Sequence, residues 1–307
     1  MGVMNWSGVS PRGLWCAGLL ALACTSCGEP AAPPSPAIAD VPVDKAAPAG
    51  MTAFVLDSAG SDMNALMYTA SGAQPHPTLL LLHGFPGNEQ NLDLAQAARR
   101  AGWNVLTLHY RGSWGSEGSF SFSNAAEDAR TALAFLRKPE TIARFRIDPR
   151  RIAVAGHSMG GFMAAHAAAG DSEVLGLWLL DAWNPGEMDD LLASPEGLQA
   201  WHEEVVTDLP PLSGTSEQAL TAELIDRSGE LDLPAKLRAY GKRPLEIIGA
   251  ERGGGAENAA MLEAARAAGN AGATGETWQT DHSFSDSRVK LSERLVAWLA
   301  TLEPAAK

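Results

Sequence analysis

The chain has 307 residues, of which 46% are hydrophobic, so it is long enough for one large domain or two small ones with a sizeable core. Its net charge of -13 at pH 7 argues against nucleic acid as a partner, because phosphate binding requires a basic surface. All three cysteines lie within the first 27 residues, so the rest of the chain has no disulfide and no thiolate metal site.

The first 24 residues have the features of an export signal. Arg12 precedes an apolar run over residues 14–23, which is too short to span a membrane. The run ends in ALAC, which resembles the signal of bacterial lipoproteins, in which the cysteine after the cleavage site is lipidated. Cys24 is therefore the expected lipidation site and membrane anchor, on the periplasmic or cell-surface side, and Cys27 is a second candidate. An ordinary secretory signal cut near Ala23 is the alternative, and it would leave the protein periplasmic or secreted.

Residues 25–51 are rich in proline and alanine, a composition that predicts a semi-rigid spacer without packing. A folded domain is expected over residues 52–303. It begins with a pair of extended segments, and short apolar runs then alternate with helical segments, which implies a mostly parallel sheet with helices on both faces. The predicted strands cover residues 52–57, 65–70, 78–84, 104–110, 151–156, 175–181, 244–250 and 275–280. The predicted helices cover residues 88–101, 124–137, 159–169, 256–268 and 288–302.

About sixty residues of mostly helical character, 184–243, interrupt this alternation after the sixth predicted strand. An insertion of this length in a sheet protein is usually a cap or lid. In and beside it, Trp183, Trp201 and the pair Leu191 and Leu192 predict an apolar pocket, although the same residues could pack the cap itself.

Ser158 stands between two glycines in the sequence GHSMG, at the junction of a predicted strand and a predicted helix. In that context the G-x-S-x-G pattern is typical of the sharp turn on which hydrolases expose a serine nucleophile. The helix that follows directs free N–H groups toward the serine. Ser158 is therefore the candidate nucleophile, and a purely structural turn is the alternative.

A serine hydroxyl needs a base, and His282 has the most suitable position among the seven histidines. It follows the last predicted strand, at the carboxyl edge of the sheet, and comes after the serine in the chain as in hydrolases. The alternative is an ordinary loop histidine. His157 lies inside the serine turn, and His83 belongs to a glycine-containing motif. The remaining histidines, His76, His109, His166 and His202, have no such context.

An ester hydrolase also needs two N–H donors for the oxyanion. Met159 can supply one at the start of its helix, and Phe85 in the motif HGFPGN can supply the other. Gly84 allows the backbone to approach closely there, and a plain glycine turn is the alternative.

Together these segments resemble the α/β-hydrolase superfamily and, within it, the prolyl-oligopeptidase/dienelactone-hydrolase group. The similar segments are LLLLHGFPG, YRGSWGSEGSFSF, IDPRRIAVAGHSMGG, TDHSFSD and the terminal RLVAWLATL, within residues 52–302. The resemblance implies the α/β-hydrolase fold, with a helical cap between strands 6 and 7. It implies Ser158 as nucleophile, His282 as base, and an oxyanion hole from Phe85 and Met159. No cofactor is expected, and no spacing of His, Asp or Cys suggests a metal.

The acid of the expected triad is where the chain departs from the family. The family usually has an aspartate after the seventh strand, where this chain has Arg252 and Gly253. Two carboxylates are candidates: Asp181, which ends the sixth strand as in some lipases and dehalogenases of this fold, and Glu251 on the usual loop. Asp181 is preferred, and an incomplete triad is a third possibility. Two other carboxylates near the histidine, at positions 281 and 286, are expected to point outward.

Two functions of different classes follow. The first is a serine hydrolase that forms an acyl-enzyme and acts on a small-molecule ester or, as a second choice, a peptide or other amide. The alternative is a lipid-anchored binding protein that kept the fold and lost efficient catalysis, because the usual acid is missing.

Overall fold

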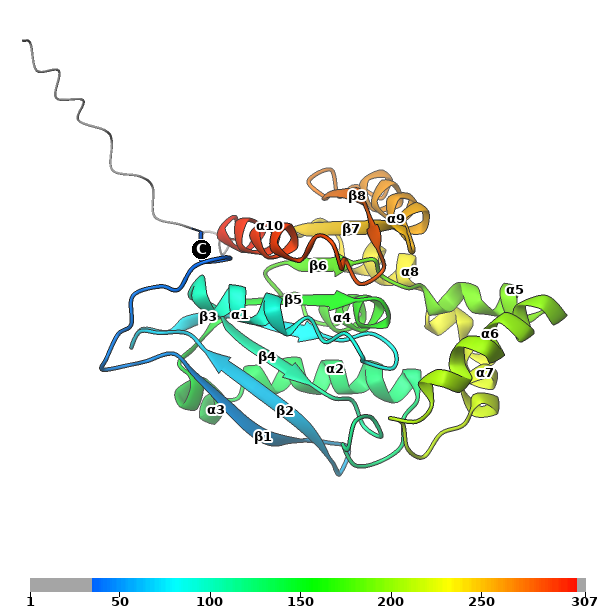
Figure 1. Ribbon diagram of the computed structural model, residues 1–307, viewed down its shortest axis with the longest axis horizontal. Helices are drawn as coiled ribbons and strands as arrows, with labels where there is room; N and C mark the ends of the chain where they lie inside the picture. Colours follow the sequence, from blue (N-terminus) through cyan, green and yellow to red (C-terminus); the bar gives the residue numbers. More distant parts are fainter. Residues whose placement is uncertain (1–34, 303–307) are drawn as a thin grey trace, which may run out of the picture. The chain divides into compact units, whose positions relative to one another are not determined.

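The computed structural model describes residues 35–302, in which eight strands form one sheet with helices on both faces (Figure 1). The order of the strands is β1-β2-β4-β3-β5-β6-β7-β8. β2 runs antiparallel to β1 and β4, and all other neighbours are parallel. The strands are β1 (Gly50–Ser58), β2 (Ser61–Thr69), β3 (His76–Leu82), β4 (Asn104–Leu108), β5 (Ile147–His157), β6 (Leu177–Leu180), β7 (Leu245–Arg252) and β8 (Thr274–Asp281).

The central strands are apolar along their whole length because both faces of the sheet are covered. In β3 all seven residues are buried: Leu79 and Leu81 pack into one core, and Leu80 and Leu82 pack into the core on the opposite face. The first core lies under α1 (Leu92–Arg100) and α10 (Arg288–Ala300). The second lies under α2 (Phe122–Leu136), α3 (Pro139–Phe145), α4 (Met159–Ala169), α8 (Leu233–Tyr240) and α9 (Gly255–Ala267). This confirms the predicted fold class.

A helical cap is inserted between β6 and β7, beyond the carboxyl ends of the strands (Figure 1). Its elements are η1 (Pro185–Glu187), α5 (Met188–Leu192), α6 (Pro195–Asp208), α7 (Glu217–Asp226) and η2 (Ser228–Glu230). The expected cap of residues 184–243 also included α8, but α8 packs against α4 and belongs to the helix layer beside the sheet.

Several element boundaries differ from those expected. α1 begins at Leu92 rather than at residue 88, because Asn91 adopts a left-handed conformation with φ 58° that a helix does not contain. α2 begins at Phe122, and its capping side chain is Ser121, whose Oγ accepts a hydrogen bond from the N–H of Asn124. The short helix α3 was not expected.

The N-terminal part of the chain differs from the expected spacer where the structure describes it. Arg100 donates hydrogen bonds of 2.7 Å each to the carbonyls of Pro36 and Ala37, and Ala37 and Ala47 are buried. The segment is therefore held on the domain at Pro36, Ala37 and Ala47, because one guanidinium can bind two carbonyl oxygens at once, while most of the other residues between 35 and 49 are exposed. The expected export signal, including Cys24, lies outside the described residues. Among residues 35–302, no helix is long and apolar enough to cross a membrane.

Candidate active site

Ser158 lies in a tight turn between β5 and α4, with φ 56° and ψ -125°. Glycines make this strained turn possible, because a Cβ at Gly156 would come within 1.9 Å of the Gly160 carbonyl oxygen. A Cβ at Gly160 would come within 2.3 Å of the Leu82 carbonyl oxygen. The two glycines that flank the serine in the sequence motif are therefore required by contact with the neighbouring backbone.

His282 follows β8 and is held by a buried carboxylate. Its Nδ1 donates a hydrogen bond of 2.6 Å to Oδ2 of Asp181, which lies just past β6 and is 1% exposed. The N–H groups of Ala250 and Gly254 also donate to this carboxylate, at 2.8 and 2.9 Å. Burial acts to raise the pKa of Asp181, but the hydrogen bonds from His282 and the two backbone N–H groups outweigh it and hold the pKa below its ordinary value. An ionised Asp181 accepts from Nδ1–H, which leaves Nε2 of the imidazole as the free acceptor.

Of the two carboxylates considered for the acid, the structure brings Asp181 to His282 and leaves Glu251 away from it. Glu251 is exposed near the end of β7, and within residues 35–302 its side chain forms no hydrogen bond or ion pair. The position where the family usually has its acid is occupied by Gly253, at which a Cβ would come within 2.2 Å of Asp181 Oδ2. The carboxylate of Asp181, just past β6, therefore fills the space that a side chain at position 253, after β7, would occupy. A residue other than glycine at position 253 would collide with it.

The other two nearby carboxylates, as expected, face other partners. Asp281 accepts a hydrogen bond of 2.8 Å from the N–H of Ser285. Asp286 accepts from the hydroxyl of Thr280 and from Arg252.

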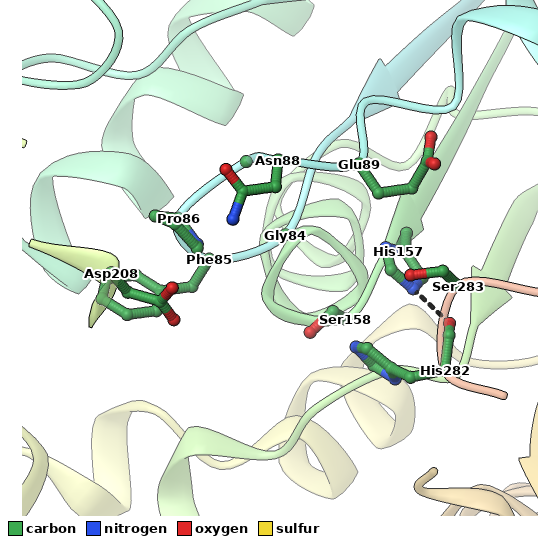
Figure 2. A pocket seen from close by; sticks show the side chains of 11 residues that line it. Gly84, Phe85, Pro86, Asn88, Glu89, His157, Ser158, Asp208, His282 and Ser283 are labelled. Atoms are coloured by element: carbon green, nitrogen blue, oxygen red, sulfur yellow. Dashed lines mark hydrogen bonds between the residues drawn. The ribbon is translucent and has the colours of Figure 1, made fainter. Parts of the chain in front are cut away.

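Ser158 and His282 face the same hollow (Figure 2). In the part of the chain that the structure describes, no hydrogen bond joins the serine Oγ to the imidazole. Such contacts are often long before substrate binds and shorten in the complex, so this geometry is compatible with proton transfer.

The loop after β3 lies directly against Ser158. A Cβ at Gly84 would come within 2.9 Å of the Cβ of Ser158, so glycine is needed for the close approach. Phe85 follows in this loop, and Met159 is the first residue of α4. Within residues 35–302, the N–H groups of Phe85 and Met159 take part in no loop or turn hydrogen bond. Both are therefore available to an oxyanion beside the serine.

His157 has a role in the site that the sequence did not reveal. Its Nε2 donates a hydrogen bond of 2.8 Å to the carbonyl of His282, and the two rings lie 4.6 Å apart (Figure 2). Burial, and next the nearby charge of His282, lower the pKa of His157 to about 4. A neutral His157 therefore holds the backbone of His282 while Asp181 holds its ring. The contact depends on how the histidine loop packs against the residue before the serine, which the local sequence does not reveal.

Two cavities meet at Ser158. The cap cavity has a volume of about 610 Å³ and the loop cavity about 190 Å³. The cap cavity is lined by Phe85, Ser158, Asp181, Ala182, Trp183, Asn184, Glu187, Met188, Leu191, Trp201, Glu204, Gly253, Gly254, Glu257 and His282. The loop cavity is lined by Gly84, Phe85, Pro86, Gly87, Asn88, Glu89, His157, Ser158, Asp208, His282 and Ser283. Trp183, Trp201 and Leu191 line the apolar pocket as expected, whereas Leu192 is buried in the core. Among the described residues, no group of three or more His, Cys, Asp or Glu side chains is placed to hold a metal ion.

Comparison with known proteins identifies the family to which the chain belongs. Residues 77–256 match the family described as alpha/beta hydrolase fold. The chain is 31% identical to Lipase 1 of Psychrobacter immobilis over 39% of its own length and 37% of the lipase. It is 30% identical to the lysophosphatidylserine lipase ABHD12 of Danio rerio, over 32% of this chain and 25% of that protein. It is also 30% identical to acylamino-acid-releasing enzyme 1 of Oryza sativa subsp. japonica, over 36% of this chain and 15% of that protein. The chain thus spans between 15% and 37% of the length of these relatives.

Solved structures show the same fold at lower identity. The carboxylesterase EstE1 from a metagenomic library superimposes with a TM-score of 0.60 at 20% identity, over 87% of this chain and 92% of the esterase. Est1E from Butyrivibrio proteoclasticus gives a TM-score of 0.60 at 16% identity, over 81% of this chain and 97% of that one. With the family match extending from β3 into α9, across the serine turn and Asp181, the chain belongs to the α/β-hydrolase fold family.

Proposed function

We propose that this protein is a serine hydrolase that cleaves carboxylic esters through an acyl-enzyme, with Ser158 as nucleophile, His282 as base and Asp181 as acid. The observation that carries the proposal is the 2.6 Å hydrogen bond from His282 Nδ1 to the buried, ionised Asp181, next to a serine in a strained turn. An imidazole fixed in this tautomer presents Nε2 as a base, which a serine hydroxyl needs at neutral pH.

The proposed reaction has two halves. His282 Nε2 takes the proton of Ser158 Oγ while Oγ bonds to the ester carbonyl carbon, and the N–H groups of Phe85 and Met159 stabilise the resulting oxyanion. The oxyanion then collapses, the bond to the alcohol oxygen breaks, and His282 gives its proton to that oxygen. In the second half, His282 Nε2 takes a proton from water while the water oxygen bonds to the acyl carbon. The resulting oxyanion collapses, the bond to Ser158 Oγ breaks, and His282 returns its proton to Oγ as the carboxylic acid leaves.

Esters are preferred as the substrate class because lipases and esterases recur among the similar proteins and structures. The similarity to an acylamino-acid-releasing enzyme favours peptides or other amides as a second class. The alternative of a non-catalytic binding protein depends on a missing acid, and the contact of Asp181 with His282 favours the hydrolase over that alternative. Membership of the prolyl-oligopeptidase/dienelactone-hydrolase group stays a prediction.

A fluorophosphonate probe and a p-nitrophenyl ester test the proposal together. The wild-type protein should be labelled and should hydrolyse the ester, and Ser158→Ala should abolish labelling and lower turnover by about 10⁴-fold or more. Ser285→Ala is the matched control, because this serine is exposed on the same loop as His282. Labelling that persists in folded Ser158→Ala, or a folded wild-type protein that neither reacts nor hydrolyses, would overturn the assignment.

A further inference from the structure

The cap cavity has walls of two chemical kinds. Apolar side chains of Phe85, Trp183, Met188 and Leu191 and the indole of Trp201 form most of it. Trp201 is held in place by a hydrogen bond of 2.8 Å from its Nε1 to Thr221 and by stacking on Phe85 at 6.3 Å between ring centres. Fixed aromatic rings of this kind bind hydrocarbon groups, and their faces also attract cations.

Carboxylates from three elements complete the wall. They belong to Glu187 of η1, Glu204 of α6 and Glu257 of α9. Within residues 35–302, none of these three side chains forms a hydrogen bond or an ion pair. No lysine or arginine lines either the cap cavity or the loop cavity. The negative charge around Ser158 is therefore not neutralised by a side chain of the wall.

Asp208 adds a further carboxyl group close to Glu204. It lines the loop cavity beside Phe85 (Figure 2) and is partly buried. Burial, and then the negative charge of Glu204, raise the pKa of Asp208 to about 6. No cationic side chain is among the groups that act on this pKa.

On the basis of the proposed esterase function, we propose that the substrate is an ester whose apolar group carries a positive charge, such as an ammonium group, and that this group occupies the cap cavity. The aromatic walls would remove the hydrocarbon part from water, while the aromatic faces and carboxylates stabilise the cation. An anionic ester would meet several carboxylates and no cationic side chain, so it should be rejected.

Three p-nitrophenyl esters of equal size test the inference. They are the esters of 4-(trimethylammonio)butanoate, its uncharged isostere 5,5-dimethylhexanoate, and the anionic 4-sulfobutanoate. Each kcat/KM is divided by the rate of hydroxide hydrolysis of the same ester, to remove differences in intrinsic reactivity. The normalised kcat/KM of the cationic ester should be about tenfold or more higher than that of the anionic ester, and the value for the neutral ester should lie between them.

Glu204→Gln and Glu203→Gln form the matched pair of variants. Both glutamates are exposed on α6, but only Glu204 lines the cap cavity. Relative to its effect on the neutral ester, Glu204→Gln should lower kcat/KM for the cationic ester by about two- to fivefold, mainly through KM, and should raise kcat/KM for the anionic ester. Glu203→Gln should change none of the three.

The outcomes separate this inference from the proposed function. Equal normalised rates for the three esters, or equal effects of the two variants, would overturn the cationic preference while leaving an esterase. Failure to hydrolyse even the neutral ester would overturn the proposed function and the inference with it.

Discussion

Asp181 is a carboxylate that remains charged although it is almost completely buried. Burial alone would favour its neutral form, but three N–H donors, from His282, Ala250 and Gly254, surround its two oxygens. A charge in a low-dielectric site costs several kcal/mol unless it is hydrogen-bonded in this way. The same three bonds fix the direction of the carboxylate, so they define where the imidazole of His282 can lie.

Asp181→Asn should lower kcat by about 10⁴-fold, because an amide favours the wrong imidazole tautomer. Glu251→Gln should have little effect on kcat, since Glu251 lies away from the histidine.

Because the pKa of Asp181 is below its ordinary value, its ionised form stabilises the fold at neutral pH, and this stabilisation is lost as the pH falls through that lowered pKa. Wild type and Asp181→Asn should therefore differ in unfolding free energy at pH 7 and converge in acid. Urea unfolding at several pH values measures this difference, and kinetics at pH 7 measure the effects on kcat. A large loss of kcat in Glu251→Gln, with little loss in Asp181→Asn, would make Glu251 the acid in place of Asp181.

The role of a single residue could be predicted where the neighbouring sequence indicates it. Ser158 and His282 could be named because the glycine motif and the position after the last strand are local signals. Asp181 could not be separated from Glu251, because the choice depends on Gly253 and its close approach to a carboxylate from a different strand. The contact of His157 with the His282 carbonyl depends on tertiary packing in the same way.

At the scale of elements, Glu223 is one of the side chains that link the cap to the sheet domain. Glu223 of α7 accepts hydrogen bonds of 2.9 and 2.7 Å from the N–H groups of Phe122 and Ser123, in the first turn of α2. A carboxylate at a helix N-terminus satisfies otherwise free donors and complements the helix dipole. This bond joins residues about a hundred positions apart, so no local sequence pattern could have predicted it.

Glu223→Gln should lower the free energy of unfolding by about 1–2 kcal/mol and increase the hydrogen exchange of α5–α7 more than that of the sheet. Asp226→Asn is the control, because Asp226 lies on the same helix and is exposed. Urea unfolding and exchange mass spectrometry measure the two effects. Equal exchange of the cap in both variants would mean that Glu223 does not hold it.

The alternation of strands and helices was predictable because buried parallel strands are continuous apolar runs. The first residues of the helices were harder to predict. They depend on backbone conformations, such as the left-handed one of Asn91 before α1, and on the Ser121 side chain that caps α2. The packing of residues 35–49 was missed because it depends on Arg100, which the proline-rich composition of the segment does not reveal.

At the scale of the whole described domain, the topology collects the site from four strands. Phe85 follows β3, Ser158 follows β5, Asp181 follows β6 and His282 follows β8. Because these strands are parallel, their carboxyl ends meet at one edge of the sheet, and the element order alone predicts that the site lies at this edge. The negative charge of the cap cavity could not be predicted from the sequence. Its carboxylates come from η1, α6 and α9, and the element order does not say how these helices are placed around the cavity.

We propose that a lipid on Cys24 anchors this domain to a membrane after export. Arg100 binds the carbonyls of Pro36 and Ala37, so the chain between Cys24 and Pro36 could span at most about 40 Å when extended. Cys24→Ser should move the protein from the membrane fraction to the soluble fraction without changing its esterase kcat, because the site lies wholly in the described domain. Cys27→Ser should leave it in the membrane fraction. Fractionation and mass spectrometry of the mature N-terminus measure this. Two or more acyl chains give stable attachment, whereas a mature N-terminus without acyl groups would mean that the protein is secreted or periplasmic.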